Sequence, residues 1–327
     1  MSLHIGRKYN IGIGKESARG TAVAATYWLP KMDYQIDDKI NYAVNSSAVG
    51  VIEDANGQDI TSKYAEGSIS GRASDTTLGL ILLATLGTDT PALVETTAYD
   101  HVFSVNESAQ HPSLTIAVAG PNESTGYRHA LAMIDSLQLD YEVNKYCTYK
   151  AGFRANAAAS GANTASFSTT ENVFLPQHAT FKIATNLAGL GAASAVSVRK
   201  VSLSIKKNVE EDWTIGNLAA VDRINKQFSV EGTVELVYSD RTYIDSILMT
   251  DTVKALRIAA VNTGVTIGAV SNPSLTVDLA AVKLSEVARK TSNNDVTTQT
   301  LKFKAFYSLA DAKMITVTLR NLVATAY

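Results

Sequence analysis

Residues 66–85 read EGSISGRASDTTLGLILLAT, and residues 231–250 read EGTVELVYSDRTYIDSILMT. The two stretches align without a gap, because 231 − 66, 240 − 75 and 250 − 85 all give an offset of 165. Self-similarity at a fixed offset is the sequence mark of a repeated structural unit. The sequence therefore predicts an internal duplication, with two related halves in one chain.

Each copy of the repeat begins with an expected strand. Ile69 in the first copy, and Val234, Leu236 and Tyr238 in the second, alternate with small or polar residues. A period of two places apolar side chains on one face of a strand and polar ones on the other. We interpret both segments as half-buried strands.

A short helix is expected to follow each strand. Ser74-Asp75 and Ser239-Asp240 are interpreted as helix caps, since a serine hydroxyl can accept from the first free amides and an aspartate favours the positive end of a helix. Gly87 suits the end of the first helix, because glycine adopts a left-handed backbone without penalty. The apolar residues then take helical spacing: Leu78, Ile81 and Leu82 in one copy, and Tyr243, Ile244, Ile247 and Leu248 in the other.

The composition bounds the class of protein. The chain has 327 residues, a net charge of −2, 46% hydrophobic residues and a mean hydropathy of +0.02. These values are those of a soluble globular protein, and they exclude a disordered chain and a basic nucleic-acid binder. Length and repeat together predict two domains, residues 1–160 with an N-terminal arm and residues 161–327, separated near the small, polar stretch 155–172.

The fold class is predicted to be mainly β, with mostly antiparallel strands and one short helix in each half. Along the later strand of the first half, Leu137 and Leu139 alternate with Gln138, Asp140 and Glu142. The same alternation recurs from Leu301 to Tyr307 in the second half. The polar side chains therefore form one face of a sheet, and the apolar ones face the core.

Two long loops precede the repeated stretches, at residues 42–63 and 208–226. Each has apolar residues around a glycine: Val49, Gly50, Val51 and Ile52 in the first, and Trp213, Ile215 and Gly216 in the second. Loops of this length are usually functional, and exposed apolar side chains on them indicate contact with another surface. The alternative is a hairpin folded back on its own domain.

The sequence does not contain the motifs of common catalytic chemistry. In GIGKESARG, Lys15 is followed by Glu16 rather than Ser or Thr, which argues against a phosphate-binding loop. The five histidines show no paired ligand spacing, and no Gly-x-Ser-x-Gly elbow is present. We expect no catalytic, cofactor or metal site. The single Cys147 is interpreted as a small core residue, which fits synthesis in a reducing cytoplasm.

No apolar run approaches the roughly 20 residues that a membrane-spanning helix needs, and the first residues do not have the pattern of a signal peptide. The sequence therefore predicts neither a membrane span nor export through a signal peptide.

The arm IGIGKESARGTAVAATYWLP (residues 11–30), the strand, the long loop and then GSISGRASDTTLGLILLATLG (residues 67–87) resemble the tail tube proteins of long-tailed bacteriophages, the siphophages. The likeness runs over the whole chain. It implies a virion structural protein made in the bacterial host cytoplasm, a β-sandwich flanked by a helix, six such units in a ring, and rings stacked into a tube that conducts DNA during ejection.

The resemblance also implies partners. Copies of the chain itself would form the rings, and other tail proteins (tape measure, terminator and baseplate) would contact the tube, while double-stranded DNA would pass without specific binding. With two units in each chain, three chains would give a ring of six units. The two long loops would make the contacts between rings, and the face with Gln138, Asp140 and Glu142 would line the lumen.

Two other functions stay open at this point. A baseplate or distal-tail ring component would form single closed rings that do not stack. An enzyme of unknown type would need a deep pocket with converging polar groups.

Overall fold

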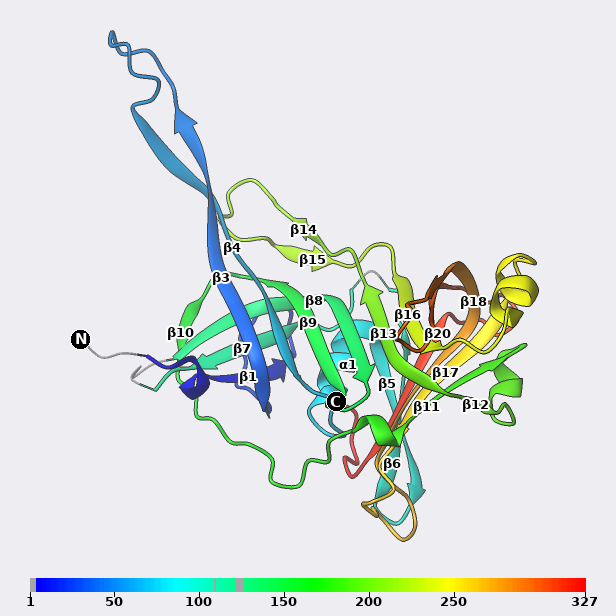
Figure 1. Ribbon diagram of the computed structural model, residues 1–327. Helices are drawn as coiled ribbons and strands as arrows, with labels where there is room; N and C mark the ends of the chain where they lie inside the picture. Colours follow the sequence, from blue (N-terminus) through cyan, green and yellow to red (C-terminus); the bar gives the residue numbers. More distant parts are fainter. Residues whose placement is uncertain (1–3, 109, 122–125) are drawn as a thin grey trace.

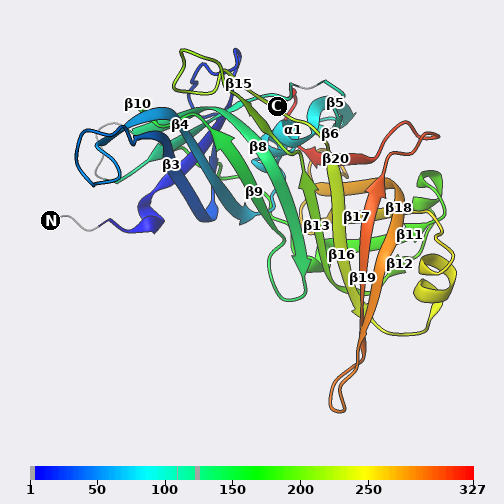
Figure 2. The same cartoon turned by 90° about the horizontal axis from the view of Figure 1, so that it is seen from above.

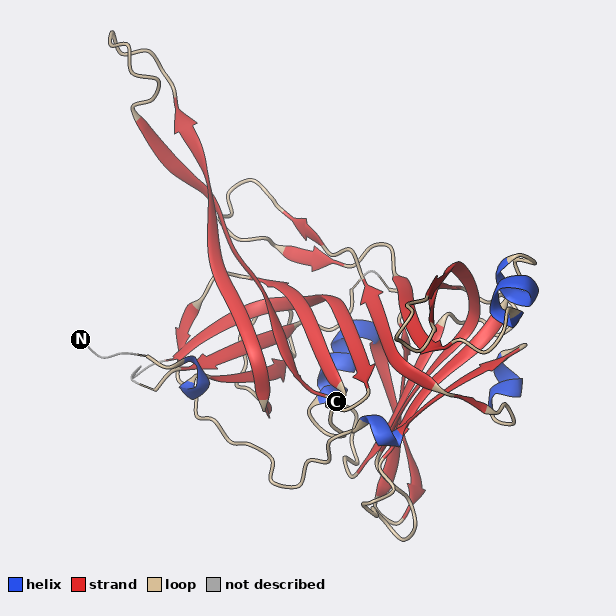
Figure 3. Cartoon of the chain, viewed as in Figure 1, coloured by secondary structure: helices blue, strands red, loops and turns tan. Residues whose placement is uncertain are grey.

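The computed structural model describes residues 4–108, 110–121 and 126–327. Strands dominate it, and helices are few and short, which confirms the mainly β prediction (Figure 3). The helical elements are η1 (Gly6–Lys8), α1 (Leu78–Leu86), η2 (Pro176–His178), η3 (Leu187–Leu190) and the π-helical turn η4 (Ile244–Leu248).

The strands of the first predicted half are β1 (Asn10–Lys15), β2 (Tyr27–Leu29), β3 (Lys31–Asn45), β4 (Gly57–Arg72), β5 (Gly87–Glu95), β6 (Ala98–Val105), β7 (Leu114–Ala119), β8 (Gly126–Glu142), β9 (Thr148–Ala155) and β10 (Ala159–Gly161). Those of the second are β11 (Ala179–Ala184), β12 (Ala195–Val196), β13 (Val198–Lys206), β14 (Glu210–Asp212), β15 (Asp222–Ile224), β16 (Ser229–Val237), β17 (Lys254–Val261), β18 (Ser274–Lys290), β19 (Thr298–Phe306) and β20 (Ile315–Asn321).

One curved sheet runs through the whole molecule. Its antiparallel order is β3-β4-β9-β8-β13-β16-β19-β18, and Figure 2 shows these strands side by side. The first four strands come from the first predicted half and the last four from the second. The pairing of β8 with β13 joins the two groups.

The two long strands β8 and β18 each continue into a second layer. The first part of β8 pairs with β7, which pairs with β1, and also with β10. The first part of β18 pairs with β17 and β20. Both strands therefore connect the curved sheet to an outer layer, and the apolar core lies between the layers.

The two groups of four strands share irregular features as well as order. The register of β8 against β9 shifts between Ile134 and Ser136, and that of β18 against β19 shifts between Leu284 and Glu286. Extra residues at a shift of this kind are β-bulges, which bend a strand at a defined point.

A glycine facing a phenylalanine also recurs in the two groups. Gly67 lies opposite Phe153, and Gly232 lies opposite Phe303. A Cβ added at Gly67 would lie 2.1 Å from the Gln35 carbonyl oxygen and 3.0 Å from the Phe153 ring. One added at Gly232 would lie 2.4 Å from the Phe303 ring and 2.6 Å from the Ser202 carbonyl oxygen. Both positions therefore need glycine for the same reason.

The helix α1 is buried on every side, as an evenly apolar helix should be. It contacts β8 and β6 and contributes to the single large core. Gly87 ends it with φ 100° and an amide bonded to the Leu83 carbonyl, so the predicted stop is confirmed. Cys147 is fully buried, and burial raises the pKa of its thiol to about 12, so the interpretation as a core residue is also confirmed.

The long-loop prediction for residues 42–63 is corrected. The strand β3 continues to Asn45 and β4 begins at Gly57, so only residues 46–56 are irregular. Cross-strand pairing therefore extends nearly to the tip, and the segment is a long hairpin that projects away from the rest of the molecule (Figure 1). In residues 208–226, the short ribbon of β14 and β15 replaces an open loop.

The two predicted halves are interleaved. The strand β6, from the first, pairs with β20 from the second. Tyr327 lies buried against Gly79 of α1, and its hydroxyl donates to the Thr76 carbonyl. The two halves therefore contact each other through a packed interface.

Candidate interaction surfaces

The hairpin of β3 and β4 carries the first set of predicted contact residues. Its exposed apolar side chains from residue 40 onward are Ile40, Tyr42, Val44, Val49, Val51, Ile52 and Ile60, and Ile52 is fully exposed. Gly50 has φ 84°, a left-handed conformation that glycine adopts freely at a turn. Apolar side chains held away from the core can gain free energy only by contact with another surface.

The second set lies on the connection from β14 to β15, beside the base of the same hairpin. Trp213 packs edge-on against Tyr64 of β4, with 6.5 Å between ring centroids, and the Leu218 carbonyl accepts from the amide of Lys63. Ile215 is fully exposed, and Gly216 has φ 93°. The structure thus brings the two predicted loops together, although Trp213 is already partly covered within the chain.

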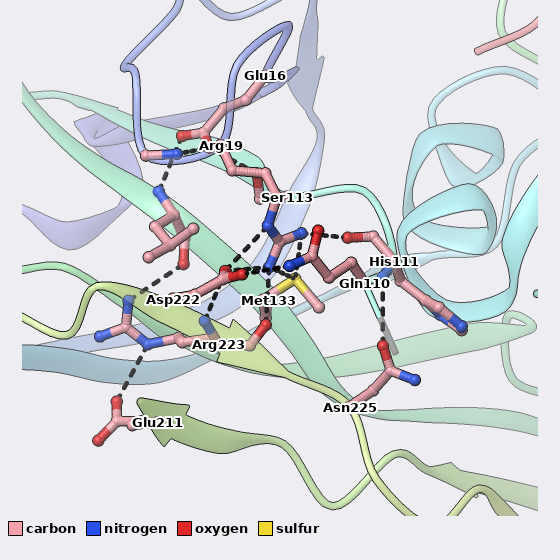
Figure 4. Close-up of polar contacts among 12 residues, drawn as sticks. Glu16, Arg19, Gln110, His111, Ser113, Met133, Glu211, Asp222, Arg223 and Asn225 are labelled. Atoms are coloured by element: carbon pink, nitrogen blue, oxygen red, sulfur yellow. Dashed lines mark hydrogen bonds and ion pairs between the residues drawn. The ribbon is translucent and has the colours of Figure 1, made fainter. Parts of the chain in front are cut away.

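A buried arginine holds the β14–β15 ribbon on the first half. The guanidinium of Arg223 donates to Glu211 at 3.0 Å (Figure 4). It also donates to Asn156 at 2.8 Å, to the Ala155 carbonyl at 2.8 Å and to the Leu131 carbonyl at 3.3 Å. Burial lowers the pKa of Arg223, and the Glu211 carboxylate opposes that shift. Five donors in a rigid fork are well suited to such a set of acceptors.

The N-terminal arm joins the same cluster. Arg19 donates from Nε to Asp222 at 2.9 Å and from a terminal nitrogen to the Arg223 carbonyl at 2.7 Å (Figure 4). Glu16 accepts from the Ser113 hydroxyl at 2.6 Å and from the Leu131 amide at 2.8 Å. The arm, the first half and the ribbon of the second half are therefore fixed to one another by charge-assisted hydrogen bonds.

Sequence reasoning missed this cluster. Glu16 and Arg19 occur in a stretch without periodicity, and Arg223 occurs in a predicted loop. Their partners are up to 204 residues away in the chain, as for Arg19 and Arg223. No spacing rule joins residues so far apart, so only the charges on otherwise small-residue segments could have drawn attention to them.

A second buried cation lies at the carboxyl end of α1. The ammonium of Lys207 donates to the Ala84 carbonyl at 2.7 Å, where the helix leaves carbonyls without helical partners. Burial lowers the pKa of Lys207 to about 7, against the opposing effect of Asp135. The helix of the first half is thus bonded to the residue that follows β13 of the second.

The predicted lumen residues lie together on one face of the curved sheet. Gln138 donates to Asp140 at 2.8 Å, and Glu142 bridges Lys200 at 3.2 Å and Lys145 at 2.6 Å. Hydrogen bonds from these two lysines hold the pKa of the Glu142 carboxyl below its usual range. A shallow groove on this face is lined entirely by residues of the curved sheet, among them Gln35, Asp37, Ser68, Gln138, Lys150 and Ser204.

The predicted caps of the first helix are wrong. The residue before α1 is Thr77, which makes no side-chain cap bond, and its amide donates to Glu171 at 2.9 Å. The Ser74 hydroxyl donates to the same carboxylate, and Asp75 accepts from Asn172 instead of from the helix. The free amide at the helix start therefore bonds to a carboxylate 94 residues away in the chain instead of to Ser74 or Asp75.

The second helical turn starts differently. Asp240 accepts from the amide of Thr242 at 2.8 Å, the contact that a capping side chain makes, and this holds the pKa of its carboxyl low. Ser239 makes no capping bond of this kind among those found in the described residues.

The family model described as "Phage tail tube protein" matches residues 6–305. A search of curated proteins finds no match.

Proposed function

The chain belongs to the phage tail tube protein family, and from that premise we propose that three copies close into a ring and that rings stack into the tail tube. As a member of this family it is a structural component of the virion tail, not an enzyme. No helix in the described part of the chain is long and apolar enough to span a bilayer.

The observation that carries the proposal is the repeated strand order of the curved sheet. The order β3-β4-β9-β8 is followed by β13-β16-β19-β18, with a bulge at the corresponding place in each group. This supports the prediction that the chain contains two tandem tube units, residues 1–160 and 161–327. The pairing of β6 with β20 means that strands of both units pair across this boundary.

Two units in each chain and three chains in each ring give six units with pseudo-sixfold symmetry. A closed cyclic assembly satisfies the same contact at every junction, and it leaves no sheet edge open. The arrangement therefore accounts for a chain that already contains one junction between units, that of β8 with β13.

The polar face of the curved sheet is the proposed lumen surface. Basic contacts to phosphate drive non-specific binding to DNA, so a conduit needs a surface on which positive charges are balanced. Gln138, Asp140 and Glu142 lie on this face beside Lys150 and Lys200, so both signs alternate there. DNA would pass without being held.

The hairpin of β3 and β4 is the proposed contact between rings. It projects from the molecule with Val49, Val51 and Ile52 exposed near its tip, and the exposed Ile215 lies on the neighbouring loop. Other tail proteins, a tape measure, a terminator and a baseplate, would meet the first and last rings. We further propose synthesis in the cytoplasm of the host of a long-tailed phage.

Electron microscopy of the purified protein tests the proposal. Hollow filaments built from three-chain rings with six lobes are expected. Single closed rings that never stack would instead identify a baseplate or distal-tail component. A protein that stays monomeric in every condition would contradict both.

A further inference from the structure

The curved sheet has two open edges at its ends. At one end β3 pairs with β4 along one side, and within the described residues no strand pairs with the other side. At the opposite end, residues 284–290 of β18 pair with β19 and, in the same part of the structure, with nothing else. An open edge presents amides and carbonyls that can accept a strand from another chain.

The junction inside the chain shows how such edges fit together. Ser136 of β8 lies opposite Lys206 of β13, and Gln138 lies opposite Ser204. The amide of Lys207 donates to the Asp135 carbonyl at 2.8 Å. Hydrogen-bonded and non-hydrogen-bonded pairs alternate along an antiparallel ladder, so the adjacent pair of Ser136 and Lys206 is a non-hydrogen-bonded one.

The strands at this junction have counterparts at the open edges. Ser136 of β8 and Glu286 of β18 each follow the bulge in their strand, so the two residues correspond with an offset of 286 − 136, which is 150. Of the two repeated glutamates, Glu66 lies opposite Asp37 of β3 and Glu231 lies opposite Ser204 of β13. Residues of β13 therefore correspond to residues of β3 with an offset of 204 − 37, which is 167. By this offset Lys206 corresponds to Lys39.

We propose that residues 35–39 of β3 in one copy pair antiparallel with residues 286–290 of β18 in the next copy, with Lys39 opposite Glu286. The inference rests on the proposed ring and specifies its partner, a second copy of this chain, and its register.

The charges of the two edges suit this register. Lys39 meets Glu286 directly, and Asp37, opposite Ala288, has Lys290 as its diagonal neighbour. On the other face of the sheet Asp38 lies opposite Val287 and diagonal to Arg289. Opposite charges at direct and diagonal positions stabilise a strand pair.

The two central side chains are available for the contact. Lys39 and Glu286 are 42% and 51% exposed, and each already pairs within its own chain, Lys39 with Glu66 and Glu286 with Lys302. The new contact would join these two pairs into a ladder of alternating charge across four strands.

A second observation, from the layer behind the sheet, supports the same junction. Inside the chain, Lys207 contacts the Ala84 carbonyl at the end of α1. The offsets relate Lys207 to Ile40 (207 − 40 is 167) and Ala84 to Met249 (249 − 84 is 165). Ile40 is 44% exposed and Met249 is 71% exposed, so the proposed junction brings together two apolar side chains that are uncovered in the single chain.

Disulfide trapping in assembled protein tests the register. The double variant Lys39→Cys/Glu286→Cys places two thiols at a non-hydrogen-bonded pair, where Cβ atoms are close enough for a disulfide. Mild oxidation is expected to give covalent dimers and trimers on a non-reducing gel. The native Cys147 is buried and does not compete.

The matched control is Lys39→Cys/Val287→Cys, which shifts one thiol by a single residue and points it to the other face of the sheet. It should not cross-link. A mixture of the two single variants, Lys39→Cys and Glu286→Cys, should give dimers and nothing larger, because each chain then carries one thiol of the pair. Unchanged thermal melting of each variant verifies that the chains are folded.

The outcomes separate the register from the ring. Rings in the microscope without cross-linking of the 39/286 pair would overturn the register and leave the proposed function standing. A cross-linked ladder that continues past three chains would support the register and overturn the three-chain ring. Absence of rings and of cross-links in the same samples would overturn both.

Discussion

Arg223 is among the largest fully buried side chains in the described residues, and its guanidinium donates to the mostly buried Glu211 carboxylate and to the Leu131 and Ala155 carbonyls. Arg223→Met should therefore destabilise the fold by about 3–5 kcal/mol, because it leaves Glu211 and two carbonyls without their donor. Urea unfolding measures the change. In the control Arg241→Met, an exposed pair with Asp245 is removed, and the free energy of unfolding should hardly change because solvent screens the pair. Equal effects would show that burial of Arg223 contributes nothing.

Lys207 predicts a pH dependence of stability. Its folded-state pKa is about 7 and its ordinary value is 10.5, so the unfolded chain binds the extra proton between these two values. Stability should rise with pH from about 7 upward, by up to about 1.4 kcal/mol per pH unit from this group. Lys207→Met should remove that slope. Urea unfolding at several pH values between 7 and 9 compares the two proteins, and parallel curves would contradict the prediction.

The predictability of single residues depends on how local their partners are. Cys147 and Gly87 could be interpreted correctly, because burial on an alternating strand and a helix stop depend on neighbouring residues. The Ser74 cap failed, since Glu171 reaches the helix start from a separate segment. Sequence spacing contains no information about a contact of that kind.

Among the elements, the long hairpin of β3 and β4 has the clearest separate role. Deleting residues 48–54 should leave the thermal melting transition unchanged, because these residues are exposed and contribute little to the core. Ring formation should continue and stacking should stop, as seen by electron microscopy.

A length-matched control replaces residues 48–54 by glycine and serine. It keeps the reach of the hairpin and removes its apolar side chains, so loss of stacking in this variant as well would assign the contact to those side chains. Loss of cooperative melting after the deletion would instead show that the tip is needed for folding.

For single elements, the alternation of apolar and polar residues predicted the strands well. Leu137, Leu139 and Tyr141 face the core as expected, and Gln138 lies on the opposite face. It did not show how far a hairpin extends, because beyond Lys39 both faces of β3 are exposed and the apolar pattern no longer distinguishes them.

For the whole molecule, the interleaving of the halves predicts one unfolding transition in the isolated chain. The strand β6 completes the outer layer around β20, Tyr327 packs on α1, and Arg19 bonds to Asp222, so neither half keeps its core when the other unfolds. Calorimetry should give a single peak with equal calorimetric and van't Hoff enthalpies. Two separate peaks would mean that the halves are independent.

The pairing of β8 with β13 has a further consequence for dilution. Because both strands belong to one polypeptide, their contact is intramolecular and forms at any protein concentration, with an effective concentration set by the connecting chain. Junctions between separate chains obey mass action and weaken as the protein is diluted. In the proposed ring, the junction within each chain would thus be permanent, and the junction between neighbouring chains would be reversible. A ring that dissociates would release paired units and never single ones.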